Sequence, residues 1–82
     1  MVEVFFDDSF TQTLSKIKDN ATKIKIRKQI HKLKKNPDAG KPMKYERKGT
    51  RELYIKPFRL SYEYIKSEDR IVLLNLYHKR KQ

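Results

Sequence analysis

The stretch that decides the fold is residues 49–62, GTRELYIKPFRLSY. It holds one strand pattern, 51–55, and the start of a second, 58–65, on either side of the pair Lys56-Pro57. In the second pattern apolar and polar residues alternate, which is the period of a strand with one buried face. A proline-containing pair between two such patterns is typical of a turn. The sequence therefore predicts two neighbouring strands joined by a tight turn.

Strand patterns also occur on both sides of this stretch. Residues 2–6, VEVFF, are short, β-branched and aromatic, which favours a first strand. Downstream, the polar loop 66–69 is followed by a further pattern at 70–77. Its almost continuous apolar run, 71–74, indicates a central position in a sheet.

Two helices are predicted between the first strand and the deciding stretch. Residues 7–9, DDS, form an N-cap signature before an apolar stripe that runs to about Lys18. Asp19-Asn20 is a second cap, and a helix over 21–35 ends at Asn36-Pro37, because proline cannot continue the backbone bonding. The residues expected to face the core are Phe10, Leu14 and Ile17 in the first helix and Ile26, Ile30 and Leu33 in the second, with Ile24 widening the second stripe.

Together these elements predict a single α+β domain over residues 1–82, with the order β-α-α-β-β-β. The short link between the helices predicts a helical hairpin. Both helices have to bury their stripes on one face of a small, mainly antiparallel sheet. The opposite face is then left for Arg51, Arg59 and their neighbours.

The charge of the chain favours a polyanionic partner. Its 21 Lys and Arg face only 10 Asp and Glu, which gives a net charge of +11. Such an excess favours nucleic acid, an acidic protein or an anionic membrane surface as partner. There are no cysteines, so disulfides and cysteine-based zinc sites are excluded, and we expect no metal and no other cofactor. No apolar run is long enough to span a bilayer and no signal-peptide pattern occurs, so we expect a cytoplasmic protein.

A candidate site is formed by cations and one histidine among the apolar positions of the strands. The side chains expected to gather around one surface are Arg51, Arg59, His78 and Arg80. Fixed cations hold a phosphodiester, and an imidazole that titrates near neutral pH can move a proton on it. Two alternatives stay open: Arg59 is paired with Glu52 or Glu63, and His78 is merely an exposed residue at a strand end.

Four motifs give the chain a family resemblance: NPDAGKP at 36–42, KGTRELY at 48–54, FRLSY at 58–62 and LYHKR at 76–80. With them, and with the element order above, nearly the whole chain resembles the RelE/ParE superfamily of toxins from type II toxin–antitoxin modules. The resemblance implies a cognate antitoxin as a partner. For the RelE type it also implies a ribosome-dependent endonuclease that cuts mRNA without a metal, through attack of the RNA 2′-hydroxyl on the adjacent phosphate.

The resemblance also implies roles for individual residues. Arg59 matches the arginine of the family's aromatic-Arg-Leu-x-Tyr strand, a phosphate-binding position, and Arg80 matches the start of the RelE basic tail. Tyr77-His78 is similar to the terminal Tyr-His pair of the YoeB branch, whose histidine serves in acid–base catalysis, and Glu46 matches that branch's carboxylate base. The implied catalytic residues are therefore Arg59, His78, Arg80 and Glu46, and the implied RNA contacts are Lys48, Arg51, Lys56, Tyr77 and Lys79.

Two other functions stay open. ParE-type members of the superfamily also carry a histidine at the end of the last strand, and they poison DNA gyrase without cutting RNA, so His78 does not decide between the types. An inactive homologue that only binds an antitoxin is the third hypothesis. The net charge favours the nuclease, because phosphate contacts scale with charge.

Overall fold

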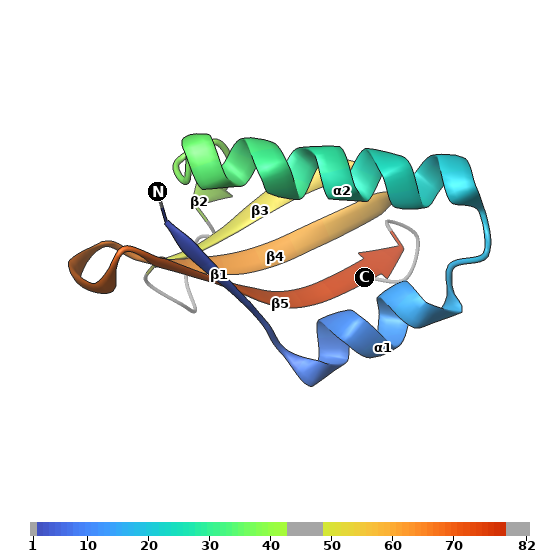
Figure 1. Ribbon diagram of the computed structural model, residues 1–82, viewed down its shortest axis with the longest axis horizontal. Helices are drawn as coiled ribbons and strands as arrows, with labels where there is room; N and C mark the ends of the chain where they lie inside the picture. Colours follow the sequence, from blue (N-terminus) through green and yellow to red (C-terminus); the bar gives the residue numbers. More distant parts are fainter. Residues whose placement is uncertain (1, 43–48, 79–82) are drawn as a thin grey trace.

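The computed structural model describes residues 2–42 and 49–78, which form a five-stranded sheet with two helices packed against it (Figure 1). The strands lie in the order β1-β5-β4-β3-β2. The predicted α+β order is confirmed, and the short strand β2 is an addition to it. The elements are β1 (Glu3–Phe6), α1 (Asp8–Lys16), α2 (Asn20–Lys35), β2 (Lys41–Pro42), β3 (Thr50–Ile55), β4 (Phe58–Ile65), a single 3₁₀ turn (Lys66–Glu68) and β5 (Arg70–His78).

The sheet is mainly antiparallel, as predicted. Strands β2, β3, β4 and β5 follow one another in antiparallel pairs, whereas β1 runs parallel to β5. The inner place of β5, between β1 and β4, agrees with its apolar run, although β4 is the middle strand. The same antiparallel pairing fixes which side chains of β3, β4 and β5 lie next to one another.

Both helices begin at the caps that the sequence predicts. The Asp7 carboxylate accepts a hydrogen bond from the Ser9 amide at 3.1 Å. The Asp19 carboxylate accepts from the Ala21 amide and, at 2.6 Å, from the Thr22 hydroxyl. The Thr22 hydrogen bond holds the pKa of Asp19 below its ordinary value, because it stabilises the ionised form. Helix α1 ends at Lys16, slightly before the predicted end near Lys18.

The core lies between the helices and one face of the sheet. Helix α1 contributes Phe10 and its C-cap residue Ile17, and α2 contributes Ile26 and Leu33. The sheet contributes Ile55, Leu60, Tyr62, Ile71, Leu73 and Leu76. The prediction that Ile24 widens the apolar stripe of α2 is wrong, since its side chain is 49% exposed. An α-helix has about 3.6 residues per turn, so Ile24, two residues before Ile26, points away from the face that Ile26 buries. Thr22, one turn before Ile26, is buried instead.

The loop after α2 is tied to the middle of the sheet by Tyr62. The Tyr62 hydroxyl accepts a hydrogen bond from the Gly40 amide and donates one to the Pro37 carbonyl, each at 2.8 Å. The approach is so close that a Cβ on residue 40 would lie 2.6 Å from the hydroxyl oxygen. Burial raises the pKa of Tyr62 above its ordinary value, so the hydroxyl keeps its proton and remains a donor.

We predict that Tyr62→Phe lowers the free energy of unfolding by about 1–3 kcal/mol, because it leaves a buried amide and a carbonyl without their partner. Urea denaturation of the two proteins measures the difference. Tyr54→Phe is the control, since Tyr54 is 52% exposed and water can replace its hydroxyl contacts. Equal losses in the two variants would show that the loop does not depend on this tether.

Candidate functional site

A row of three polar side chains crosses the face of the sheet opposite the helices. The register pairs Tyr54 with Arg59 across β3 and β4, and Arg59 with Tyr77 across β4 and β5. The neighbouring row, Leu53, Leu60 and Leu76, packs in or against the core under the helices. Because successive side chains of a strand point to opposite faces, the Tyr54–Arg59–Tyr77 row lies on the other side. We call this side the helix-free face.

Glu52 brings Arg59 and Tyr77 together on the helix-free face. Its Oε1 forms an ion pair with Arg59 Nη1 at 2.7 Å, and its Oε2 accepts a hydrogen bond from the Tyr77 hydroxyl. The side chains of Arg59 and Glu52 are 30% and 22% exposed, so the pair is partly open to solvent. Of the alternatives left open by the sequence, the structure shows Arg59 paired with Glu52.

A hollow of about 430 Å³ lies beside this ion pair, at the edge of the sheet where β2 is only two residues long. Its lining brings a lysine and a tyrosine next to the ion pair, which provides cationic and aromatic surface in one place. The lining residues are Ala39, Lys41, Glu52, Leu53, Tyr54 and Arg59. The helix-free face therefore combines an arginine, a carboxylate and a phenol with space for a ligand group.

Arg51 lies on the other face of the sheet, so the prediction that it shares a surface with Arg59 is wrong. Register pairs it with the buried Tyr62. Its guanidinium donates to the Gly40 carbonyl at 2.7 Å and forms an ion pair with Asp38 at 3.2 Å. Since Arg51 is an odd number of residues from Glu52 and Tyr54, the strand pleat turns it toward the loop after α2. In this position it holds the loop.

His78 also lies away from Arg59, which corrects the second half of the predicted grouping. It is paired with Phe58 across β4 and β5, and the two rings meet edge to face with their centroids 5.6 Å apart. Phe58 and His78 share strand parity with Leu60 and Leu76, so the imidazole is on the helix-bearing side. Among the described members of the predicted grouping, Arg59 therefore shares a surface with neither Arg51 nor His78.

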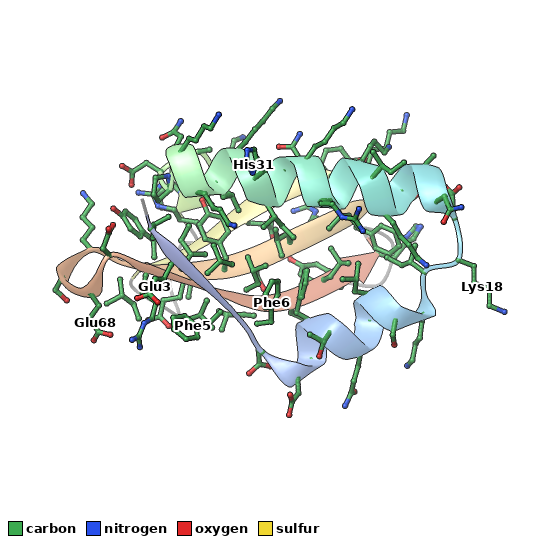
Figure 2. All side chains as sticks on the ribbon, in the orientation of Figure 1. Glu3, Phe5, Phe6, Lys18, His31 and Glu68 are labelled. Carbon is green, nitrogen blue, oxygen red and sulfur yellow. The ribbon has the colours of Figure 1, made fainter. Side chains whose placement is uncertain are left out.

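The remaining predicted residues are placed only in part. Lys56 lies exposed in the turn between β3 and β4, and its carbonyl accepts a hydrogen bond from Lys25 Nζ at 2.9 Å. Glu46, Lys48, Lys79 and Arg80 lie outside the described residues. Glu52 is the site residue that the sequence analysis weighed only as an ion-pair partner. The other histidine, His31, is exposed on α2 (Figure 2).

A second hollow, of about 240 Å³, lies between the two helices and the end of β1. Its lining is mostly apolar, and two cations border it. The lining residues are Phe6, Leu14, Lys23, Ile26, Arg27 and Ile30. Phe6 stacks on Phe10 of α1 but keeps 53% of its surface exposed. We call this hollow the interhelical groove; it has the composition of a docking site for an apolar segment with acidic flanks.

Over residues 2–42 and 49–78, no three or more His, Asp and Glu side chains are placed together to hold a metal ion. Neither helix in these ranges is long and apolar enough to cross a membrane.

Known proteins resemble the chain in two ways: one protein family matches its sequence, and several solved structures share its fold. The family described as the ParE toxin of the type II toxin–antitoxin system parDE matches residues 4–82. No curated protein sequence matches the chain. The isolated RelE toxin of E. coli superimposes with a TM-score of 0.83 at 12% identity, over 100% of this chain and 88% of that chain.

Two further solved structures are similar. A YoeB/ParE toxin from Agrobacterium tumefaciens has a TM-score of 0.82 at 20% identity and covers 94% of this chain and 98% of that chain. The toxin–antitoxin complex RelBE2 from Mycobacterium tuberculosis has a TM-score of 0.81 at 23% identity, with coverages of 95% and 98%. At these identities the comparison establishes a shared fold.

We predict that Arg51→Gln lowers the free energy of unfolding by about 1–2 kcal/mol, because it removes a charged donor from the Gly40 carbonyl and from Asp38. Lys41→Gln, which removes an exposed cation from adjoining β2, is the control and should change stability little. Urea denaturation measures both. If the Arg51→Gln protein has unchanged stability but fails to bind RNA, Arg51 is an RNA contact and not a loop tether.

Proposed function

We propose, from the premise that the chain belongs to the ParE toxin family of type II toxin–antitoxin modules, that this toxin cleaves mRNA on the ribosome with the helix-free face of its sheet. The family confirms the RelE/ParE superfamily predicted from the four sequence motifs. The observation that supports cleavage is the cluster of Arg59, Glu52 and Tyr77 beside the hollow at the sheet edge.

The proposed reaction needs a cation at the scissile phosphate. The RNA 2′-oxygen forms a bond to phosphorus, and the bond from phosphorus to the 5′-oxygen of the next nucleotide breaks. One proton leaves the 2′-hydroxyl, and one is delivered to the departing 5′-oxygen. Negative charge develops on the phosphate oxygens, and the forked donors of the Arg59 guanidinium match those oxygens. Tyr54 and Tyr77, on either side of Arg59, offer rings on which bases can stack.

Proton transfer in this proposal involves the residues named from the resemblance. Arg80 and Glu46 keep their proposed catalytic roles, and Lys48 and Lys79 their proposed RNA contacts. His78 would act from the opposite face of the sheet, since its ring lies with Phe58 on the helix-bearing side. This separation makes His78 a weaker catalytic candidate than Arg59.

Gyrase inhibition is the second candidate, and two observations favour it. Arg59 is already neutralised by Glu52, and His78 points away from it. A surface of this kind suits binding to another protein better than acid–base chemistry, which needs its groups within hydrogen-bond reach of one another. The resemblance implies DNA gyrase as the target of ParE-type members.

One pair of assays separates the two functions. In vitro translation with the purified toxin is followed by primer extension on the mRNA, and gyrase supercoiling is measured in parallel. Discrete cuts in the mRNA with normal supercoiling support the nuclease. Intact mRNA with blocked supercoiling supports the gyrase inhibitor, and no effect in either assay supports an inactive antitoxin-binding homologue.

We predict that Arg59→Ala slows mRNA cleavage by roughly 10²–10³-fold, the usual cost of removing one group that stabilises transition-state charge. The change should leave the fold intact, because partly exposed ion pairs stabilise little. Single-turnover cleavage on programmed ribosomes measures the rate, and thermal melting checks the fold. Arg27→Ala, which removes an exposed arginine of α2, is the control.

His78→Gln belongs in the same series. Because its ring lies on the helix-bearing side, we expect it to slow cleavage less than Arg59→Ala does. A folded Arg59→Ala protein with full activity would remove Arg59 from the mechanism. A larger loss in His78→Gln than in Arg59→Ala would return the main role to the histidine.

We also propose that a cognate antitoxin binds the interhelical groove. RelE-like toxins are found in complexes with their antitoxins. The groove of this toxin has an apolar floor and is bordered by Lys23 and Arg27. An amphipathic helix with acidic flanks matches such a surface in both shape and charge.

We predict that Lys23→Glu combined with Arg27→Glu slows association with the antitoxin by roughly 10-fold at low salt, because charge complementarity acts mainly on the on-rate. Stopped-flow mixing at several salt concentrations measures it, and the difference should shrink as salt rises. Lys32→Glu with Lys35→Glu makes the same charge change at the other end of α2 and is the control. Equal slowing by both pairs would place the antitoxin elsewhere.

A further inference from the structure

Glu52 holds two donors that belong to two other strands. Its carboxylate, on β3, contacts the Arg59 guanidinium on β4 at 2.7 Å and the Tyr77 hydroxyl on β5. Both carboxylate oxygens are engaged, one by each donor. A charged fork and a neutral hydroxyl that converge on one anionic group are the elements of an oxyanion-binding site.

We infer that the Glu52 carboxylate is an exchangeable anion, which in the free toxin occupies the phosphate site proposed at Arg59, with the Tyr77 hydroxyl as the second donor of that site. A carboxylate and a phosphate offer a guanidinium the same arrangement of two acceptor oxygens. The entering phosphate therefore replaces Glu52 at Arg59 without any change in the sheet.

Exchange requires that the resident ion pair opens easily and that the displaced groups have space. The Arg59–Glu52 pair is partly exposed, and such pairs add little to stability. The hollow beside it is lined by both partners and by Lys41, so an incoming anion meets a further cation before it reaches Arg59. In these features Glu52 differs from a fully buried carboxylate, which would hold its arginine in a permanent ion pair.

A displaced Glu52 remains a few ångströms from the bound phosphate and repels it, so the wild-type toxin binds an isolated phosphate weakly. Removing this charge should tighten binding by roughly 5-fold, the effect of one unit charge at about 4 Å in a well-solvated site. The exchange rests on the proposed function, which places the RNA phosphate at Arg59.

Glu52→Gln tests the inference, with Glu63→Gln as its matched control. Glu63 lies on β4 with the same parity as Arg59 and is paired by register with Thr50 and Val72. Both substitutions raise the net charge by the same amount on the helix-free face. The probes are inorganic phosphate and a tetranucleotide with 2′-O-methyl riboses, which cannot be cleaved, and NMR titration of the full chain gives the dissociation constants.

We expect Glu52→Gln to bind both probes roughly 5-fold more tightly than wild type, and Glu63→Gln to change affinity less than 2-fold. Adding Arg59→Gln to Glu52→Gln should abolish the gain. Equal gains in the two single variants would overturn the inference, because they would reflect net charge alone. In the wild-type toxin the Arg59 Nε–H signal should shift on titration with phosphate, and its failure to shift at saturation would also overturn the inference.

The outcome is separable from the proposed function. Tighter binding in Glu52→Gln with no mRNA cleavage by the wild type would retain the anion site and reject the nuclease. Cleavage by the wild type without any gain in Glu52→Gln would retain the nuclease and reject the exchange.

Discussion

The contact between Gly40 and Tyr62 is the constraint on which the rest of the structure depends. The Tyr62 ring reaches through the core from β4 to the loop after α2, and its hydroxyl satisfies an amide and a carbonyl of that loop. A side chain at residue 40 would meet the hydroxyl at 2.6 Å and the Glu52 carbonyl at 2.9 Å, so only glycine allows this approach. Arg51 then binds the Gly40 carbonyl from β3. Three of the four motifs that carry the family resemblance thus meet in one contact.

This contact also positions the candidate site. Because the loop is held at Gly40, the chain continues directly into β2, which pairs Lys41 with Glu52 on β3. The backbone of Glu52 therefore faces the tethered loop, while its side chain reaches Arg59 and Tyr77 on the helix-free face. A substitution that loosens the loop acts on the site through β3, although it lies on the other side of the sheet.

The fold could be read from the sequence because its signals are local. The caps at Asp7 and Asp19 and the stop at Asn36-Pro37 are each visible within a few residues. The two-residue turn at Lys56-Pro57 also fixes the β3–β4 register, and with it the diagonal position of Glu52 beside Arg59. The same parity shows that Arg51 belongs with Leu53 and Ile55, on the buried side. The predicted grouping of Arg51 with Arg59 conflicts with this alternation, which is visible in the sequence.

The position of Tyr77, in contrast, could not be predicted from the sequence, because it depends on a register shift that no local sequence pattern indicates. The β4–β5 register shifts by one residue between Ser61 and Tyr62. Extending the register of the hairpin end, where Ile65 meets Arg70, would place Leu76 opposite Arg59 and turn Tyr77 to the helices. The bulge reverses this, so that Leu76 enters the core and Tyr77 joins Glu52. The same shift turns His78 toward Phe58, which is why the predicted cluster of Arg59 with His78 does not form.

The cations that produce the net charge of +11 are not distributed evenly over the two sides of the sheet. On the strands, Arg51, Arg59 and Arg70 are each paired with an acidic side chain. The exposed lysines of α2 supply much of the excess that is left in the described residues. Long-range attraction of a polyanion, which is sensitive to salt, therefore belongs mainly to the helical side. Contact of the proposed kind on the helix-free face depends instead on whether a phosphate displaces the Glu52 carboxylate from Arg59. In the proposed function, attraction and phosphate recognition therefore belong to different faces of the same small sheet.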